Sequence, residues 1–214
     1  MVRQAKPWFV RTIRERSEEP RHRELLDAAA RVFADLGYER TTVAAITAEA
    51  RVSRATLYVY FASKDEVFLA LAARIRDDFL AAQLTELPAD SPRAVLREAI
   101  RAVARAVETH GRLLRLIEQR AMLDPRVAGI FTEIRERPIR RFARFLDRES
   151  TAGRVALPAP AAVVAEALST ALTMGILVRL NASARVRTAF VGNMITIYET
   201  LIGIDGREGW PQLD

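Results

Sequence analysis

The residue types that carry covalent catalysis are scarce in this sequence. It has 214 residues with no cysteine and two histidines, His22 and His110. It has no GxSxG segment, no glycine-rich loop that would cradle phosphates, and no pair of histidines at metal-binding spacing. These features argue against an enzyme, so we expect no catalytic residue, no metal and no cofactor.

A denser set of polar side chains lies in one segment, AEARVSRATLYVYFASKDEV, residues 48–67. It contains hydroxyl, guanidinium and ammonium groups, which donate hydrogen bonds to phosphate oxygens and base edges. Ser53 is a natural N-cap for a helix that begins at Arg54. On that helix Leu57 and Phe61 would face a core, so the other residues face outward. A capped helix with polar residues on its outward side is more typical of binding to an anionic partner than of catalysis.

The outward residues suggest two kinds of contact. Arg54 and Thr56 lie near the helix N-terminus, where free amides and the helix dipole favour phosphate, and both are placed to reach base edges. Tyr58, Tyr60 and Lys64 are placed for phosphates, which position a protein without reading sequence.

The net charge of +6 favours nucleic acid or a membrane surface without choosing between them. Of the 33 basic residues only Lys6 and Lys64 are lysine, a bias that genome composition explains most simply. The absence of cysteine fits a reducing compartment, and the N-terminus has no apolar run long enough for a signal peptide. We therefore expect a cytoplasmic protein.

Helices must position the polar segment. Residues 21–36 carry apolar side chains at three- and four-residue spacings, and Gly37 follows as a C-cap. A helix of about two turns follows Thr42, and the residues RVS then separate it from the helix at Arg54. Two short helices joined by a turn of about three residues form a helix-turn-helix, whose second helix can enter the major groove of DNA.

The run AAARVFADLGYERTTVAAITAEARVSRATLYVYFASKDEVF closely resembles the N-terminal DNA-binding domain of TetR-family transcriptional regulators. The motif that carries the resemblance comprises Phe33, Gly37, Thr42, Val43, Ile46, Ala50, Val52, Ser53, Leu57, Tyr58, Phe61 and Lys64. The resemblance implies phosphate contacts at Thr42, Tyr58, Tyr60 and Lys64, and base contacts at Arg54, Ala55 and Thr56.

The sequence departs from this family at Arg51, a turn position that is commonly glycine. A left-handed backbone would cost a non-glycine residue on the order of 1 kcal/mol. Either the turn adapts or Arg51 adds a phosphate contact. Adaptation is the simpler expectation, and Arg51 joins Ser53 and the residues above as a candidate DNA-binding residue.

We expect an all-α fold with an N-terminal three-helix helix-turn-helix domain and a larger helical domain for ligand binding and dimerisation. The expected segments are a basic arm (1–20), the helix-turn-helix domain (21–66), the effector and dimerisation domain (67–204) and a tail (205–214). The arm either reaches a minor groove or is a solvated tail. The expected later helices cover 65–84, 93–109, 112–123, 124–145, 160–180 and 185–202.

The last two helices suggest a dimer. No charge occurs between Ala167 and Val178, a segment too short to span a bilayer, which needs about twenty residues. A helix that is apolar on every side must be buried on every side, so one face would pack against a second chain. The resemblance implies the same four-helix interface, for which we expect Ala171, Gly175, Phe190, Met194 and Tyr198.

The resemblance also implies a pocket for a small effector among the middle helices. The expected apolar wall comprises Leu114, Ile117, Met122, Phe131, Ile134, Phe142, Met174 and Val178, with His110, Glu118 and Thr173 as polar anchors. For each of these residues, the alternative is that its side chain packs in an ordinary hydrophobic core and lines no pocket. The mostly apolar wall points to a hydrophobic effector.

These features predict a homodimeric, sequence-specific DNA-binding regulator, a repressor that a largely hydrophobic effector releases from a palindromic operator. The alternative is an orphan or activating regulator of the same fold with no effector-release switch. A membrane-surface protein would share the positive charge, and a helical scaffold would share the core, but neither explains the helix-turn-helix.

Overall fold

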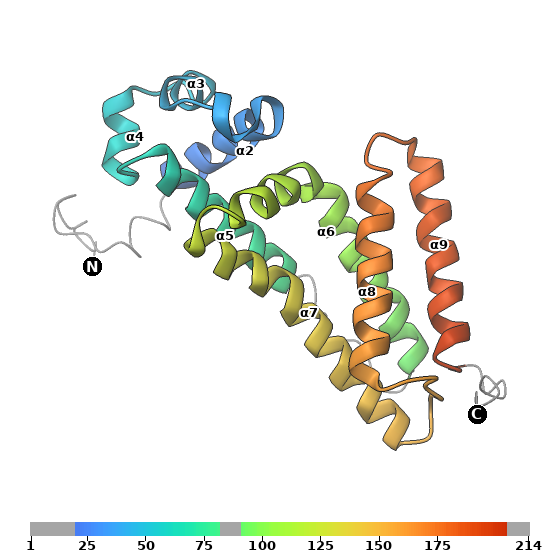
Figure 1. Ribbon diagram of the computed structural model, residues 1–214. Coiled ribbons are helices and arrows are strands. Elements are labelled where there is room, and N and C mark those ends of the chain that lie inside the picture. The colour runs from blue at the N-terminus through green and yellow to red at the C-terminus, as the bar shows by residue number, and fades with distance from the viewer. Residues whose placement is uncertain (1–19, 82–90, 205–214) are drawn as a thin grey trace, which may run out of the picture. The chain divides into compact units, whose positions relative to one another are not determined.

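The computed structural model describes residues 20–81 and 91–204, in which every regular element is a helix (Figure 1). The all-α prediction is therefore confirmed. The chain divides into two compact units, Met1–Arg74 and Ile75–Asp214. This division and the boundary expected at residue 66 both fall within α5 (Lys64–Ala81). Residues 1–19 of the expected arm, the end of the helix expected over 65–84 and the tail at 205–214 lie outside the described residues.

The first unit contains α2 (Pro20–Arg40), α3 (Val43–Glu49), α4 (Arg54–Tyr60) and the start of α5. Gly37 adopts φ 75° and ends the regular part of α2 at the expected position. The spaced apolar residues of all four helices meet in one core, which includes Leu25, Ala29, Phe33, Ile46, Leu57, Phe61, Val67 and Phe68. This core holds α3 and α4 in place.

In the second unit, α6 (Pro92–Ala121) is a single helix. The prediction of two helices here, separated at His110 and Gly111, was wrong. Gly111 lies inside α6 and faces Leu180, because a Cβ atom added to it would lie 2.7 Å from the Leu180 side chain. The glycine therefore permits close packing, although in the sequence it looks like a helix end.

The helix α7 (Pro125–Thr151) extends beyond its expected end at residue 145. Asp124 caps its first turn through a 2.9 Å hydrogen bond accepted from the amide of Arg126. It ends at Thr151, and Gly153 in the turn that follows adopts a left-handed φ of 69°. Buried apolar residues of α7, such as Ile134 and Leu146, pack in the core of this unit.

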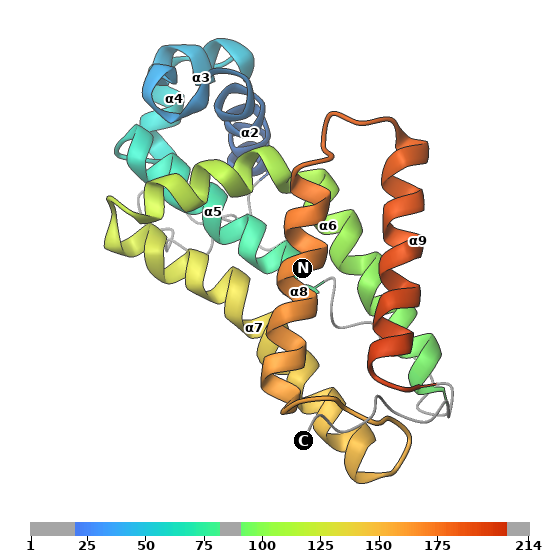
Figure 2. The same cartoon turned by 45° about the vertical axis from the view of Figure 1, so that its right-hand side comes forward.

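The helices α8 (Ala161–Leu177) and α9 (Ala184–Leu201) run antiparallel and side by side in both views (Figures 1 and 2). Their close approach depends on Gly175, since an added Cβ atom would lie 2.0 Å from the Phe190 ring. Arg179 lies 4.3 Å from the centroid of the same ring and donates a 2.8 Å hydrogen bond to the Gly175 carbonyl. These contacts fix the register of the two helices.

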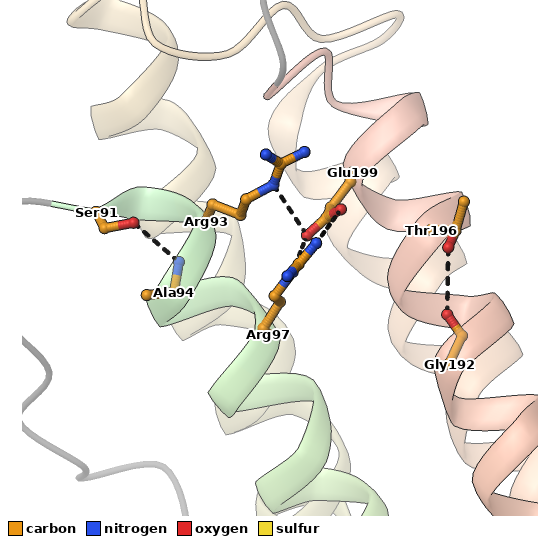
Figure 3. Close-up of polar contacts among 7 residues, drawn as sticks. All are labelled: Ser91, Arg93, Ala94, Arg97, Gly192, Thr196 and Glu199. Carbon is orange, nitrogen blue, oxygen red and sulfur yellow. Dashed lines mark hydrogen bonds and ion pairs between the residues drawn. The ribbon is translucent and has the colours of Figure 1, made fainter.

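A nearly buried carboxylate ties α9 to the beginning of α6 (Figure 3). Glu199 accepts two hydrogen bonds from Arg97, one of them 3.0 Å long, and its carboxylate lies 3.3 Å from Nε of Arg93. The hydrogen bond from Arg97 is the main cause that lowers the pKa of Glu199. The cluster therefore favours the charged form of Glu199.

Among the described helices, none combines the length and the apolar character that crossing a membrane requires.

Candidate nucleic-acid interface

Each helix of the helix-turn-helix begins at a hydroxyl cap. The Thr42 side chain accepts a 3.1 Å hydrogen bond from the amide of Ala45 at the start of α3. The Ser53 side chain accepts a 3.0 Å hydrogen bond from the amide of Thr56 at the start of α4. Both caps satisfy amides that have no partner within their own helix, which explains why the two short helices start at these residues.

The turn between α3 and α4 is a Schellman motif with Arg51 at its left-handed position. Arg51 has a φ of 54°, and the amides of Arg51 and Val52 bond the carbonyls of Ala48 and Thr47 at 3.2 and 3.0 Å. The expectation that the turn would adapt was wrong, because the backbone keeps the glycine-type conformation. The same pattern of hydrogen bonds closes α7 and α9, and there glycines, Gly153 and Gly203, occupy the left-handed position.

Replacing Arg51 by glycine is expected to stabilise the folded protein by about 1 kcal/mol, because glycine adopts this backbone without the strain of a Cβ atom. Thermal unfolding of the wild type and the variant measures the difference. Arg51→Ala is the matched control, since it removes the charge and keeps the Cβ strain. Equal stability of the glycine and alanine variants would show that the turn stores no such strain.

The helix α4 divides into a buried side and an outward side. Leu57 is fully buried and Phe61, the residue that caps α4, is 4% exposed, as predicted. On the outward side Arg54 and Ala55 are exposed, and Tyr58 is 55% exposed. Thr56 and Tyr60 are half-buried.

The outward side of α4 also presents Val59, which is 40% exposed. Val59 was not among the candidate residues predicted from the sequence. Its position between two outward tyrosines was the available signal, and an exposed apolar side chain there suits contact with a thymine methyl group. The surface that would contact a DNA duplex thus carries hydrogen-bond donors and one apolar side chain.

Lys64 lies apart from this outward side. Its side chain is half-buried, and its Nζ atom donates a 3.0 Å hydrogen bond to the carbonyl oxygen of Tyr38. Thr42, the N-cap of α3, and Arg51, in the turn before α4, are by contrast exposed.

The candidate effector residues do not gather around one space in the described structure. Leu114, Ile117 and Ile134 are buried, while Met122 and Val178 are 78% and 70% exposed. Of the remaining candidates, Glu118 and Met174 are exposed and His110, Phe131, Phe142 and Thr173 are half-buried.

A groove of about 310 Å³ lies between the middle of α6 and the end of α8, and Val178 is the candidate effector residue that lines it. The other lining residues are Arg112, Arg115, Leu177, Leu180 and Asn181. Arg115 donates a 2.7 Å hydrogen bond to the Leu177 carbonyl and so caps the last turn of α8. The polar residues of this groove could not be predicted from the sequence, because Arg112 and Arg115 belong to α6 whereas Asn181 lies in the segment that follows α8.

The candidate dimer residues fall into two groups. Ala171 is exposed on α8, whereas Gly175 and Phe190 pack on each other between α8 and α9. Met194 and Tyr198 are 6% and 3% exposed, so their side chains lie inside the protomer. A row of exposed residues that includes Ala171 runs along α8 at three- and four-residue spacings and comprises Val163, Ala167, Ala171, Met174 and the C-cap Val178; α9 adds the exposed Val186 and Ile197.

Comparison with known proteins agrees with this architecture. The family described as "Bacterial regulatory proteins, tetR family" matches residues 25–71. The chain is 36% identical over 107 residues to the HTH-type transcriptional repressor AcnR of Corynebacterium diphtheriae, covering 49% of this chain and 52% of that protein. Across the curated relatives, the matched segments span between 18% and 52% of the relative's length.

Solved structures match a larger part of the chain than the curated sequences do. A TetR-like transcriptional regulator from Rhodococcus sp. RHA1 has a TM-score of 0.66 and 28% identity, over 87% of this chain and 97% of that one. FadR from Bacillus subtilis, solved in complex with stearoyl-CoA, has a TM-score of 0.65, 86% and 98% coverage, and 15% identity, which shows the fold alone.

A capped helix-turn-helix joined to a larger all-helical unit defines the class of helix-turn-helix transcriptional regulators. Within that class, residues 25–71 match the TetR family, and a solved TetR-like regulator has a similar fold over most of the chain.

Proposed function

We propose that the protein is a homodimeric transcriptional repressor that binds a palindromic operator through α4 and is released by a small, largely hydrophobic effector. The observation that carries the proposal is the outward side of α4, where Arg54, Ala55 and Tyr58 are exposed beside the capped helix N-terminus. Such a helix inserts its N-terminal residues into the major groove. The proposal assigns no catalytic activity and places the protein in the cytoplasm, with the DNA that it binds.

The candidate DNA-binding residues other than Lys64 each have a role in this proposal. Arg54, Ala55 and Thr56 contact base edges, and Thr42, Arg51, Tyr58 and Tyr60 contact phosphates. The hydroxyl group of Ser53 caps α4 and also lies 2.9 Å from the hydroxyl oxygen of Thr56, so its contribution is to hold the N-terminus of α4 in place. Phosphate contacts provide affinity, and base contacts provide preference for one sequence.

The exposed row on α8 and α9 supports a homodimer. Met174 and Val178 are 50% and 70% exposed there, together with small residues such as Ala167 and Ala171 that permit close packing. This row replaces Met194 and Tyr198 in our proposed interface, since those two side chains are already buried. Two-fold symmetry would place two recognition helices about 34–36 Å apart, which matches a palindromic operator.

Effector release would be a population shift. An effector that binds the DNA-incompetent arrangement more tightly lowers operator affinity by the ratio of its two affinities. Stearoyl-CoA, the ligand of the Bacillus subtilis neighbour, is a suitable first probe because its acyl chain is long and apolar. If the probe tightened the DNA complex, repression with a co-repressor would replace release.

The experiment that tests the function is selection from a pool of random duplexes, followed by titration over a range of salt concentrations. We expect enrichment of a palindromic sequence, and an affinity that falls steeply as salt rises because bound phosphates release counterions. Anionic lipid vesicles are the control. Equal binding to vesicles and all duplexes, with no enriched sequence, would refute a sequence-specific regulator.

A further inference from the structure

Lys64 joins the two chain segments that flank the helix-turn-helix. Its Nζ atom lies 3.0 Å from the Tyr38 carbonyl oxygen and 4.4 Å from the centroid of the Tyr38 ring. The adjacent Asp65 accepts a hydrogen bond from the Tyr38 hydroxyl group. Tyr38 precedes α3, whereas Lys64 and Asp65 begin α5, so this Tyr38–Lys64–Asp65 cluster closes a loop of chain that contains α3, the turn and α4.

The cluster is attached to the core through the Tyr38 ring. That ring packs edge-on against Phe68, with centroids 5.0 Å apart, and stacks on Phe33 at 5.8 Å. Both phenylalanines are buried, at 2% and 0% exposure. Tyr38 therefore has a fixed orientation, and its carbonyl and ring present a defined site to the ammonium group.

The identity of residue 64 fits this geometry. Lys64 is one of two lysines among the 33 basic residues of an arginine-rich chain. An ammonium group is compact and directs three donors around one nitrogen, so it can meet a carbonyl oxygen and a ring face of the same residue. A guanidinium group is a larger planar fork and would not fit both contacts in the same way.

We propose that Lys64 is a positioning residue of the DNA-binding unit, which fixes α3 and α4 by holding the end of α2 against the start of α5. This role differs from the phosphate contact that family resemblance implies for Lys64. It rests on the proposed function, because its consequence is measured as affinity for duplex DNA.

The test compares Lys64→Arg, which keeps the charge, with Lys64→Gln, which removes it. Affinity for the selected operator is measured at a temperature where thermal unfolding shows that every variant is fully folded. We expect both variants to bind about fivefold to tenfold more weakly, because both lose the contacts with Tyr38. The slope of log affinity against log salt should stay at the wild-type value, since no phosphate contact is lost.

Two further variants complete the design. Arg23→Gln removes one exposed charge from the same unit and controls for net charge. Tyr38→Leu removes the ring and keeps the carbonyl oxygen, so its effect should add only in part to that of Lys64→Gln, because both substitutions remove the contact between the ammonium group and the ring. If Tyr38→Leu does not fold, Tyr38→Phe removes only the bond to Asp65 and keeps both contacts with Lys64, so Lys64→Gln should weaken binding in Tyr38→Phe by the same factor as in the wild type.

Wild-type affinity for Lys64→Arg, together with a salt slope lowered in Lys64→Gln, would overturn the proposal in favour of a phosphate contact. A lower unfolding temperature with unchanged affinity would also overturn it, because Lys64 would then serve stability alone. A wild-type protein that binds no duplex would refute the proposed function itself, an outcome that is separate from both.

Discussion

Replacing Arg54 by alanine is expected to lower affinity for the selected operator by about tenfold to hundredfold, the range for losing a bidentate contact to a base. Arg54 is the first residue of α4 and is exposed, so the truncation removes a donor without opening the core. Affinity for unrelated duplexes should fall only slightly. The ratio of specific to non-specific affinity, measured by competition titration, should therefore decrease.

Arg101→Ala is a matched control for this prediction. Arg101 is an exposed arginine on α6, so its removal changes the net charge equally and leaves α4 intact. We expect the control to keep the affinity ratio of the wild type. A loss of affinity that is the same for operator and unrelated DNA in Arg54→Ala would assign Arg54 to a phosphate rather than a base.

The helix-turn-helix could be predicted from the sequence because its determinants are local. The hydroxyl groups of Thr42 and Ser53 cap helices that begin one residue later, and the spacing of Leu57 and Phe61 defines the buried side. Each of these signals acts within about one helical turn. The family resemblance added the roles of individual residues, but not the conformation of Arg51.

Other features depend on contacts between residues far apart in the sequence. Gly111 was interpreted as a helix end, yet it packs on Leu180 of the segment after α8. Met194 and Tyr198 are apolar or aromatic at helical spacing, and the sequence does not tell whether the same chain or a second chain covers them. The pattern of a helix predicts that a face is buried, but it does not predict which surface buries that face.

Lys64 is an intermediate case. Its position in the motif was visible in the sequence, and so was the scarcity of lysine. The contact of Lys64 with Tyr38 was not visible in the sequence, because it joins residues on either side of the helix-turn-helix. The family motif thus identifies an important position, but it does not tell which groups the side chain at that position contacts.

Replacing Glu199 by glutamine is expected to destabilise the protein by about 1–3 kcal/mol at neutral pH, because hydrogen bonds to a charged group are lost where water has little access. The Glu199 side chain is 8% exposed, whereas those of Arg93 and Arg97 are 41% and 42% exposed and can be solvated after the substitution. Denaturant unfolding measures the change. Glu98→Gln is the control, since Glu98 pairs with Arg105 on the surface and should contribute little.

The same substitution should change how stability depends on pH. Arg97 and Arg93 lower the pKa of Glu199 in the folded protein below its ordinary value of 4.5. A carboxylate with a lowered folded pKa stabilises the protein above its unfolded pKa, and this stabilisation is lost as pH falls through the folded pKa. The wild type should therefore lose more stability below about pH 4.5 than Glu199→Gln does.

Glu149 makes the same kind of contribution, so the variant should keep part of the acid sensitivity. Arg154 and Arg148 lower the pKa of Glu149, which is 3% exposed at the end of α7. Only the difference between wild type and Glu199→Gln isolates the α6–α9 cluster. Parallel curves of stability against pH would mean that Glu199 is not charged more readily in the folded state, and that its charge does not hold α9 to α6.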